Sequence, residues 1–476
     1  MVAQSIRLSL PPKSFNMTSL PFPYFLEQNP VNADGNRSAL VAVGRCRINP
    51  STYSSVDEYR AICAKNKEQA LVDTDTPETK DANKKLKKKY MKQGVAMASK
   101  YLRETLKLDV SIINVEVVVD SKDVLETDGC LAACLLDAGC SAIVVSGLDT
   151  TVMDTAKIPR ERIIAHFSED SVSSDIVGAA LSLASTISVD LSNNSMESVD
   201  KILSLVPQKK DMVTFQLTPG LSTDELTSIV PQISKKCKDF KGRIGIVNPS
   251  ANDLGLSFSA CMRTDRPDGL FTTVVCTRTG EALGLVYSSK ESIIAALECG
   301  RGVYYSRSRK GLWRKGDTSG HYQTLHRLDV DCDGDALRFT VTQRGDDHCA
   351  FCHLNTLTCW GDPVGLRHLE GTLQERLKSA PEGSYTKRLF DDSELLRDKL
   401  VEEAQELAEA TEPDDVAGEL ADVLYFAMTR AIKAGISIDD AVAELDRRTR
   451  KVTRRKGDSK AFRIAAGNAI LGKKGN

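Results

Sequence analysis

The sequence predicts a multidomain protein that combines an α/β domain, a mixed β-rich domain and an all-α domain. Short β-branched runs alternate with helical stretches over residues 41–250, which is typical of an α/β fold with a parallel sheet. Strands joined by a tight turn, with one helix, fill residues 251–365. Helical periodicity fills residues 370–460. A chain of 476 residues is long enough for about three such domains.

The first block, residues 41–250, is predicted to be a non-catalytic α/β domain. Its β-branched runs lie at 38–48, 110–120, 140–147, 162–167, 211–217 and 243–249, and its helical stretches at 91–106, 128–138 and 222–238. We find no glycine-rich phosphate loop and no nucleophile–base pair in this block. We therefore expect a structural or docking role on a scaffold related to a barrel, although catalytic residues can be scattered among strand ends. Residues 1–40 and 461–476 are predicted to be tails.

The second block, residues 251–365, begins with a predicted hairpin over 268–289 that turns at Thr279 and Gly280. A helix should follow, with Ser288 or Ser289 as its N-cap and Gly300 at its end. Beyond it, cations alternate with hydroxyls and glycines: Arg307, Arg309, Arg314 and Lys315 among Ser306, Gly316, Thr318, Ser319 and Gly320. This mixture suits phosphate, because backbone N–H groups can approach the anion while the cations neutralise it. The alternative is a charged surface hairpin.

Residues 331–359 contain most of the candidate metal ligands. Three thiols, Cys332, Cys352 and Cys359, can hold zinc and leave a fourth position open for water. The three carboxylates of this segment, which suit magnesium, are Asp331, Asp333 and Asp335. If 331–335 is extended, the aspartates share one face and Cys332 points away from them. This arrangement predicts two separate metal sites. Cys332 would then meet the other thiols by a fold-back of the chain or across a subunit interface.

A calcium-type acidic loop beside unrelated buried cysteines is the alternative. Such a loop normally continues with further oxygen ligands and a closing glutamate. Residues 336–342 instead read as a strand, so metal-assisted hydrolysis is the better prediction.

The third block, residues 370–460, presents paired carboxylates on its helices. Glu403 and Glu406 are three residues apart, as are Glu419 and Asp422, so each pair shares a helix face. Apolar residues that include Leu420 mark the predicted core side of the same helices. Carboxylates near a helix seam are costly unless they bind a metal or pair with cations, whereas solvated faces are the alternative. The basic residues of 447–456 are predicted to form a phosphate clamp beside this acidic cluster.

Composition limits the partners and the compartment. The net charge is -2, which gives no bulk attraction to nucleic acid, and no apolar run approaches the length of a membrane span. The 13 cysteines follow no secreted spacing, so reduced thiols and a cytoplasmic location are expected.

The second block resembles phosphoribosyl-AMP cyclohydrolases of histidine biosynthesis. The resemblance rests on YYSRSRKGLWRKGDTSG at 304–320, DCDGDALRF at 331–339 and CHLNTLTC at 352–359. The third block resembles phosphoribosyl-ATP pyrophosphohydrolases through KLVEEAQE and GELADVLYF. The order of the blocks is similar to that of fungal multifunctional histidine-biosynthesis proteins, without their histidinol dehydrogenase section, so that activity is expected to be absent.

The resemblance implies roles for individual residues. It implies zinc on Cys332, Cys352 and Cys359, shared across a homodimer interface. It implies proton transfer by His353. The implied magnesium ligands are Asp331, Asp333, Asp335, Glu403, Glu406, Glu419 and Asp422, and the implied substrate-binding residues are Arg307, Arg309, Trp313, Lys315, Thr318, Ser319 and Gly320. Cys349 departs from the family pattern, since this second thiol just before Cys352 could compete for the zinc.

The implied function is a bifunctional hydrolase that acts on two small molecules, phosphoribosyl-ATP and phosphoribosyl-AMP. The first would lose pyrophosphate and the second would undergo opening of its adenine ring. One alternative is a generic nucleotide deaminase joined to a pyrophosphatase, although the H-x-E signature of zinc deaminases is missing. Another is a zinc-stabilised dimeric scaffold without turnover.

Overall fold

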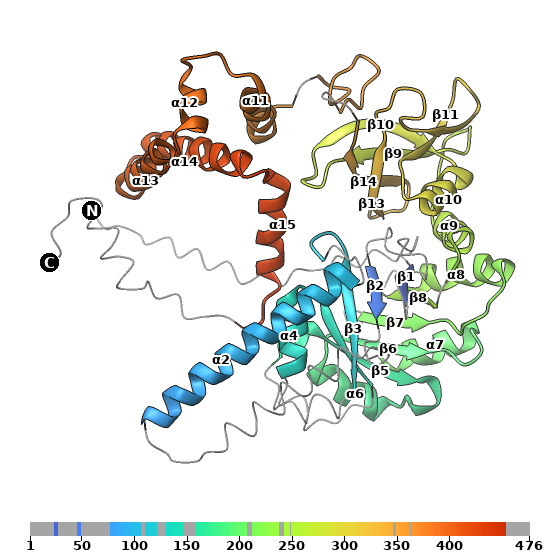
Figure 1. The fold of residues 1–476 in the computed structure, drawn as a ribbon. Coiled ribbons are helices and arrows are strands. Elements are labelled where there is room, and N and C mark those ends of the chain that lie inside the picture. Colours follow the sequence, from blue (N-terminus) through green and yellow to red (C-terminus); the bar gives the residue numbers. More distant parts are fainter. Residues whose placement is uncertain are drawn as a thin grey trace, which may run out of the picture.

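The computed structural model shows a multidomain α/β protein, as predicted. It describes residues 23–26, 45–48, 77–105, 110–120, 130–146, 158–206, 212–237, 242–247, 249–345, 349–361 and 363–453. A closed parallel barrel is followed by a four-stranded mixed sheet with a small hairpin, and then by a group of helices (Figure 1). No helix in these ranges is long and apolar enough to cross a membrane.

Eight strands form the barrel. They are β1 (Pro23–Leu26), β2 (Arg45–Ile48), β3 (Asn114–Asp120), β4 (Ala142–Ser146), β5 (Ile163–Ser168), β6 (Thr186–Asp190), β7 (Met212–Gln216) and β8 (Arg243–Val247). Each strand is parallel to its neighbours, and β1 closes the ring by pairing with both β2 and β8. The prediction that residues 1–40 are a tail is wrong for β1, whose four residues are too few to show an alternating pattern.

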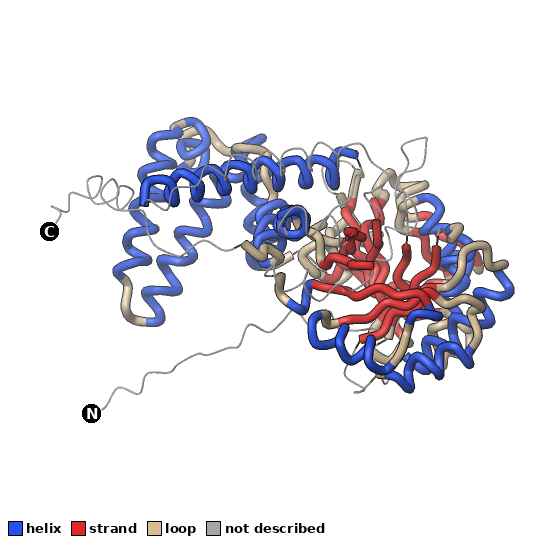
Figure 2. Tube along the Cα trace, turned by 90° about the horizontal axis from the view of Figure 1, so that it is seen from below, coloured by secondary structure: helices blue, strands red, loops and turns tan. Residues whose placement is uncertain are grey.

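Helices surround the outside of the barrel, as Figure 2 shows from below. They are α2 (Pro77–Lys100), which continues into a short π-helix at Tyr101–Thr105, α4 (Cys130–Ala138), α6 (Ser174–Leu183), α7 (Met196–Leu205) and α8 (Thr223–Cys237). Val115, Val117 and Val119 alternate along β3 and are buried in the core beneath these helices. Strand β6 escaped prediction because the polar Ser188 and Asp190 interrupt its apolar run.

The mixed sheet follows α9 (Ala251–Ala260). Its strands run in the order β10 (Ala282–Ser288), β9 (Phe271–Cys276), β14 (Ala336–Gln343) and β13 (Gln323–Val330). The predicted turn at Gly280 is confirmed, and its φ of 90° is one that glycine adopts without strain. In α10 (Lys290–Cys299), Ser289 rather than Ser288 is the N-cap, and Gly300 ends the helix in the left-handed conformation. Strands β11 (Val303–Ser306) and β12 (Gly311–Arg314) form the separate hairpin.

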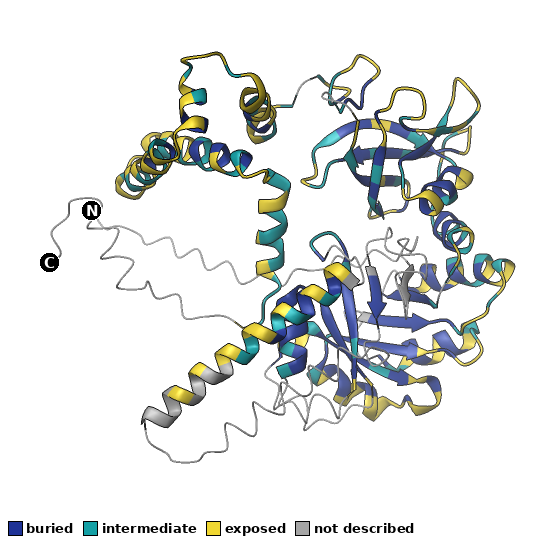
Figure 3. Ribbon diagram, in the orientation of Figure 1, coloured by how far each residue is buried: buried dark blue, intermediate teal, exposed yellow. Residues whose placement is uncertain are grey.

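The C-terminal part is helical, as predicted. It consists of α11 (Gly365–Ser379), α12 (Tyr385–Asp391), α13 (Ser393–Glu409), α14 (Pro413–Lys433) and α15 (Ile438–Thr449). Its buried clusters are small and separate from the large core shared by the barrel and the mixed sheet (Figure 3). Leu420, predicted on the core side, is 45 % exposed, whereas Phe426 and Met428 on the same helix are buried.

The basic stretch that begins at the end of α15 contacts the barrel through Arg450. Arg450 donates from Nη1 to the carbonyl oxygens of Val110, Ile113 and Gly139. Arg447 and Arg448 both pair with Glu444. Carbonyl oxygens and a carboxylate already bind these three arginines, while their binding of phosphate stays a prediction. Arg454, Arg455 and Lys456 lie outside the described residues.

Candidate functional site

A turn between β13 and β14 gathers the three aspartates. Their carboxylate oxygens lie within 4.8 Å of one another, close enough to bind one cation together. The Oδ1 atom of Asp331 accepts hydrogen bonds from the backbone N–H groups of Gly334, Asp335 and Ala336, and this closes the turn. Gly334 permits the turn through its φ of 88°.

These contacts shift the pKa values of Asp331 and Asp335 in opposite directions. Burial acts to raise the pKa of Asp331, but the hydrogen bonds from the backbone hold it below the ordinary value. Burial and the neighbouring charges of Asp333 and Asp331 raise the pKa of Asp335. Mutual repulsion of this kind is relieved when a cation binds between the carboxylates.

The expectation of an extended 331–335 segment is wrong. The side chains converge because the chain curls around Asp331, and strand alternation plays no part. The argument that Cys332 must point away from the aspartates therefore loses its basis. Cys332 is nevertheless exposed, and among the described residues it joins no group of three potential metal ligands.

The other two thiols approach each other in the loop after β14. The side chains of Cys352 and Cys359 are near enough to shift each other's pKa, and the Cys359 N–H donates to the carbonyl of Leu283 at 2.8 Å. The pKa of Cys352 is lowered, mainly because the backbone N–H of Leu354 donates a hydrogen bond to its Sγ atom at 3.5 Å. Burial, and then the neighbouring Cys352, raise the pKa of Cys359. The pair can thus share one proton or one metal.

His321 and Gln343 hold the start of this loop in place. The Ala350 N–H donates to Nδ1 of His321 at 2.8 Å, and Gln343 Nε2 donates to the Ala350 carbonyl at 3.1 Å. Cys349, the competing thiol, lies 3.9 Å from the carbonyl of Gly345 instead, so the structure places Cys352 beside Cys359.

Strand β14 separates the aspartate turn from the thiol pair. The turn immediately precedes this strand and the thiol loop follows it. The loop folds back beside the sheet, because Cys359 bonds to Leu283 on the neighbouring strand β10. Among the described residues, however, no group of three ligand atoms within 4.8 Å of one another contains Cys332, so the structure does not bring it to the other two thiols within one chain.

The hairpin β11–β12 brings one predicted substrate-binding cation to the thiols. Lys315 is 6 % exposed, and its Nζ lies 5.4 Å from the ring centre of Phe351 and 5.9 Å from that of Trp313. Burial lowers the pKa of Lys315, while the charges of Cys359 and Cys352 act to raise it. A cation beside two thiols favours their deprotonated, metal-binding form.

The other predicted substrate-binding residues lie at the surface of the same domain. Arg307 stacks over the ring of Tyr287 with 4.1 Å to its centre. The exposed members of the set are Arg307, Arg309, Thr318, Ser319 and Gly320. His353 is also exposed, with Nδ1 3.9 Å from Cys352 Sγ. Exposure leaves these groups accessible to a bound nucleotide.

In the helical part, α13 and α14 bring carboxylates together. Oxygen atoms of Glu403, Glu406 and Glu419 lie within 4.8 Å of one another. Burial, followed by repulsion from Glu406 and Glu403, raises the pKa of Glu419. Its Oε2 atom is buried and has no hydrogen-bond partner among the described residues. A buried acceptor without a donor is costly, so this atom is suited to a cation.

Two neighbours complete this cluster. The charge of Asp422 also raises the pKa of Glu419, which places it beside the three glutamates. Lys399 Nζ lies 2.9 Å from Glu403 and 2.8 Å from Glu402, and so fixes the only buried carboxylate of the three.

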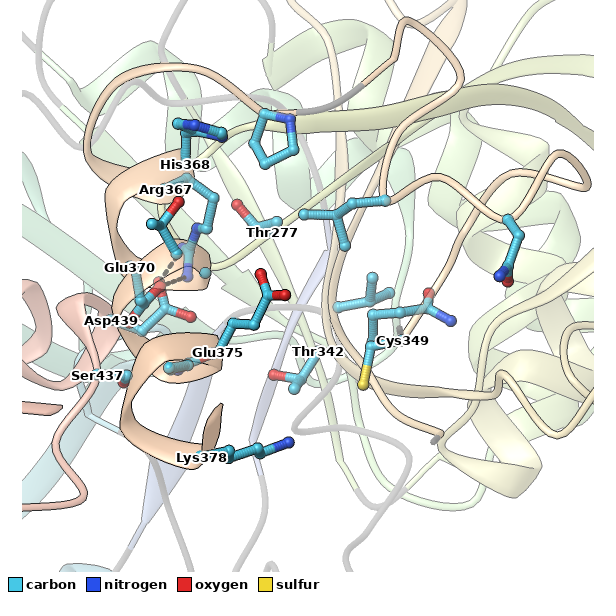
Figure 4. Close-up of a pocket in the computed structure, with 18 of the residues that line it drawn as sticks. Thr277, Thr342, Cys349, Arg367, His368, Glu370, Glu375, Lys378, Ser437 and Asp439 are labelled. Atoms are coloured by element: carbon cyan, nitrogen blue, oxygen red, sulfur yellow. Dashed lines mark hydrogen bonds and ion pairs between the residues drawn. The ribbon is translucent and has the colours of Figure 1, made fainter. Parts of the chain in front are cut away.

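A cavity of about 880 Å³ lies between the thiol loop and α11 (Figure 4). Arg367, Glu370, Lys378 and Cys349 are among its lining residues, and Arg367 donates to Asp439 at 2.6 Å and to Thr279 at 2.7 Å. None of the predicted metal ligands or substrate-binding residues lines this cavity. It is therefore an interdomain space, separate from both ligand clusters.

Prediction from the sequence missed a polar network inside the barrel. His166, Ser188 and Gln216 are mutually hydrogen-bonded there, although each lies on a different strand. The signal that was available is the recurrence of polar residues at alternate positions in otherwise apolar strands.

Two family models match the C-terminal half of the chain. Phosphoribosyl-AMP cyclohydrolase matches residues 284–361, and phosphoribosyl-ATP pyrophosphohydrolase matches residues 366–449. The first range contains the aspartate turn and the thiol loop, and the second contains the glutamate cluster.

Similar proteins are named for histidine biosynthesis. The Schizosaccharomyces pombe histidine biosynthesis bifunctional protein his7 is 41% identical over 359 residues, covering 73% of this chain and 83% of that protein. The Thermus thermophilus bifunctional protein HisIE is 35% identical over 198 residues, which are 38% of this chain and 90% of the relative. A Kluyveromyces lactis trifunctional protein is 54% identical over 200 residues, or 42% of this chain, but only 25% of its own length is matched. The chain thus belongs to the family of bifunctional histidine biosynthesis proteins, with a phosphoribosyl-AMP cyclohydrolase domain followed by a phosphoribosyl-ATP pyrophosphohydrolase domain.

Proposed function

We propose that this chain catalyses two successive hydrolyses. Its helical domain, residues 370–460, converts phosphoribosyl-ATP to phosphoribosyl-AMP and pyrophosphate. The domain at 251–365 then opens the adenine ring of phosphoribosyl-AMP. One observation carries the proposal: a carboxylate cluster and a thiol pair lie separately in the two regions that match the two family models.

For pyrophosphate release, Glu403, Glu406, Glu419 and Asp422 would hold magnesium. The buried Oε2 of Glu419 fits a cation because the described part of the chain offers it no hydrogen-bond donor. Magnesium, when bound, neutralises the charge of the triphosphate. Lys399 keeps Glu403 in place through the 2.9 Å contact. Water then attacks a phosphorus atom, and pyrophosphate leaves.

For ring opening, Cys352 and Cys359 would hold zinc together with Cys332 of a second copy of the chain. The adjacent Lys315 fits this site, since a cation stabilises thiolates. Zinc, when bound, supplies water that is activated near neutral pH. Water adds to C6 of the adenine, the N1–C6 bond breaks, and His353 would pass a proton to N1. Asp331, Asp333 and Asp335 would hold magnesium near the phosphoribosyl groups.

A homodimer is part of this proposal. In the described residues Cys332 joins no group of three ligands, so one chain is taken to supply only two thiols to each site. In a two-fold symmetric dimer, Cys332 of each chain can complete the site of the other, and two equivalent sites result.

Mixing two inactive variants tests this arrangement. Cys332→Ser and Cys359→Ser should each lack ring-opening activity alone. After dissociation and re-association of an equal mixture, half of the dimers contain both variants and have one intact site of two. Activity should return to roughly a quarter of the wild-type value. A site built within one chain predicts no recovery.

The proposal also includes a role for the N-terminal α/β domain and a cellular location. Residues 41–250, with β1, would serve as a non-catalytic docking scaffold. The bonds from Arg450 to the barrel support this role, as does the 2.6 Å bond from Arg162 to the Arg450 carbonyl. A cytoplasmic location suits the cysteines of the described residues, none of which forms a disulfide.

Incubation of the full chain with phosphoribosyl-ATP, zinc and magnesium tests the function. Separation of the products should yield pyrophosphate and a ring-opened nucleotide. A deaminated product with an intact ring would favour the deaminase alternative, and the absence of turnover would favour a scaffold.

A further inference from the structure

The barrel interior is unusually polar. Closed parallel barrels are normally filled by branched apolar side chains. Here a small apolar cluster of Ala142, Val144 and Ile164, with Val118 packed against it, occupies part of the interior. The buried polar residues on the described barrel strands are Arg47, Glu116, Thr186, Ser188, Thr214, Gln216 and Arg243.

Strand register brings several of these polar groups to the carboxyl ends of the strands. His166 on β5 is level with Ser146 on β4 and Ser188 on β6. Asp190, the last residue of β6, is level with Gln216, the last residue of β7. Side chains alternate along each strand, so residues paired in register share one face. The carboxyl ends of barrel strands are where ligands bind in this architecture.

Hydrogen bonds fix His166 and Asp190 in place. Gln216 Nε2 lies 2.9 Å from Nδ1 of His166 and donates to Ser188 Oγ at 3.0 Å. With Nδ1 accepting, the ring proton is on Nε2, which lies 3.2 Å from an Asp190 oxygen. Ser188 also accepts from Arg47, at 3.0 Å.

The network continues deeper into the barrel. Arg47 and Arg243 pair with Glu116 at 3.0 Å and 3.3 Å, and all three side chains are almost fully buried. Burying charges is costly even when they are paired. Packing alone does not explain why charged residues are buried here, because branched apolar residues would fill the same space without that cost. A binding site that needs His166 and Asp190 held rigidly does explain the burial of these charged residues.

We propose that the carboxyl end of this barrel binds a small polyhydroxylated molecule of the pentose class. The Asp190 side chain is 55% exposed while His166 anchors one of its oxygens, so it can accept further hydrogen bonds from ligand hydroxyls. A carboxylate at this position disfavours anions and favours a neutral ligand rich in donors. Carboxylates bind ribose hydroxyls in this way at the strand ends of other α/β folds. The site lies in the domain to which the proposed function gives no chemistry.

Saturation-transfer NMR with D-ribose and the full-length protein tests the proposal. Transfer to the ribose protons is expected with wild type, and Asp190→Ala should weaken binding about tenfold or more, since it removes charged hydrogen bonds. Asp200→Ala is the matched control, because Asp200 is also half exposed and pairs only with Lys236 at 2.7 Å among the described contacts. Asp190→Asn, which keeps the shape of the side chain, should give an intermediate loss.

Equal melting curves for Asp190→Ala and Asp200→Ala would show that the loss of binding is not a loss of fold. Two results overturn the proposal. One is the absence of transfer to ribose with wild type. The other is unchanged transfer with Asp190→Ala, which would place the binding in one of the hydrolase domains.

Discussion

Replacing Arg450 with alanine should loosen the C-terminal helix from the barrel without weakening substrate binding. Arg450 Nη1 donates to the carbonyls of Ile113 and Gly139 at 3.2 Å and 3.1 Å, and also to that of Val110. Hydrogen bonds that involve a charge contribute about 1.5–3 kcal/mol each, but one nitrogen shares these three, so we expect a total near 3 kcal/mol. For a unit of the barrel's size this lowers the melting temperature by roughly 6–12 °C.

Scanning calorimetry, combined with the KM for phosphoribosyl-ATP, measures both effects. Arg448→Ala is the control, because its side chain is 61% exposed and pairs only with Glu444 among the described contacts. The control should change the melting temperature by less than 2 °C, since surface ion pairs contribute about 0–1 kcal/mol. An Arg450→Ala variant with normal melting and a raised KM would refute the docking role and support the predicted phosphate clamp.

Three further predictions concern the carboxylate cluster, the thiol pair and helix α15. Glu419→Gln combined with Asp422→Asn should abolish pyrophosphate release, measured with an enzyme-coupled phosphate assay, but leave turnover of supplied phosphoribosyl-AMP intact; normal release would show that these are ordinary solvated acids. Cys359→Ala should lose bound zinc, measured by mass spectrometry, together with ring opening, while pyrophosphate release continues; full zinc content would exclude the thiol site. The paired arginines lower the pKa of Glu444 to about 2 from 4.5. Its stabilising contribution is therefore complete above pH 4.5 and is lost as the pH falls towards 2, so Glu444→Gln should flatten the acid limb of a stability profile over that window. An unchanged acid limb would contradict this coupling.

The fold was predictable wherever pattern and length agreed. The apolar runs of β3 and β4 and the capped helix α10 carry strong local signals, and the structure confirms them. Strands β1 and β6 were missed because one is short and the other has polar side chains facing the barrel interior. Their identity as strands depends on neighbours distant in the sequence, which no local pattern reports.

In the candidate site, too, contacts between residues close in the sequence could be predicted, and contacts between residues far apart in the sequence could not. The sequence spacing correctly indicated which aspartates meet, but for the wrong reason, because Asp331 curls the chain through three backbone hydrogen bonds. The nearness of Lys315 to Cys352 and Cys359 depends on how a hairpin packs against a loop. The polar network around His166 depends on strand register, and residue spacing along the chain carries no information about register.

A time course of the reaction of the full chain with phosphoribosyl-ATP, followed by anion-exchange chromatography, tests the order of the two hydrolyses. Pyrophosphate and phosphoribosyl-AMP should appear first, and the ring-opened nucleotide should then replace phosphoribosyl-AMP. Chelation of zinc alone should stop the reaction at phosphoribosyl-AMP. Ring opening that continues without zinc, or phosphoribosyl-AMP that is never consumed, would contradict the central claim that two separate metal sites perform two successive hydrolyses.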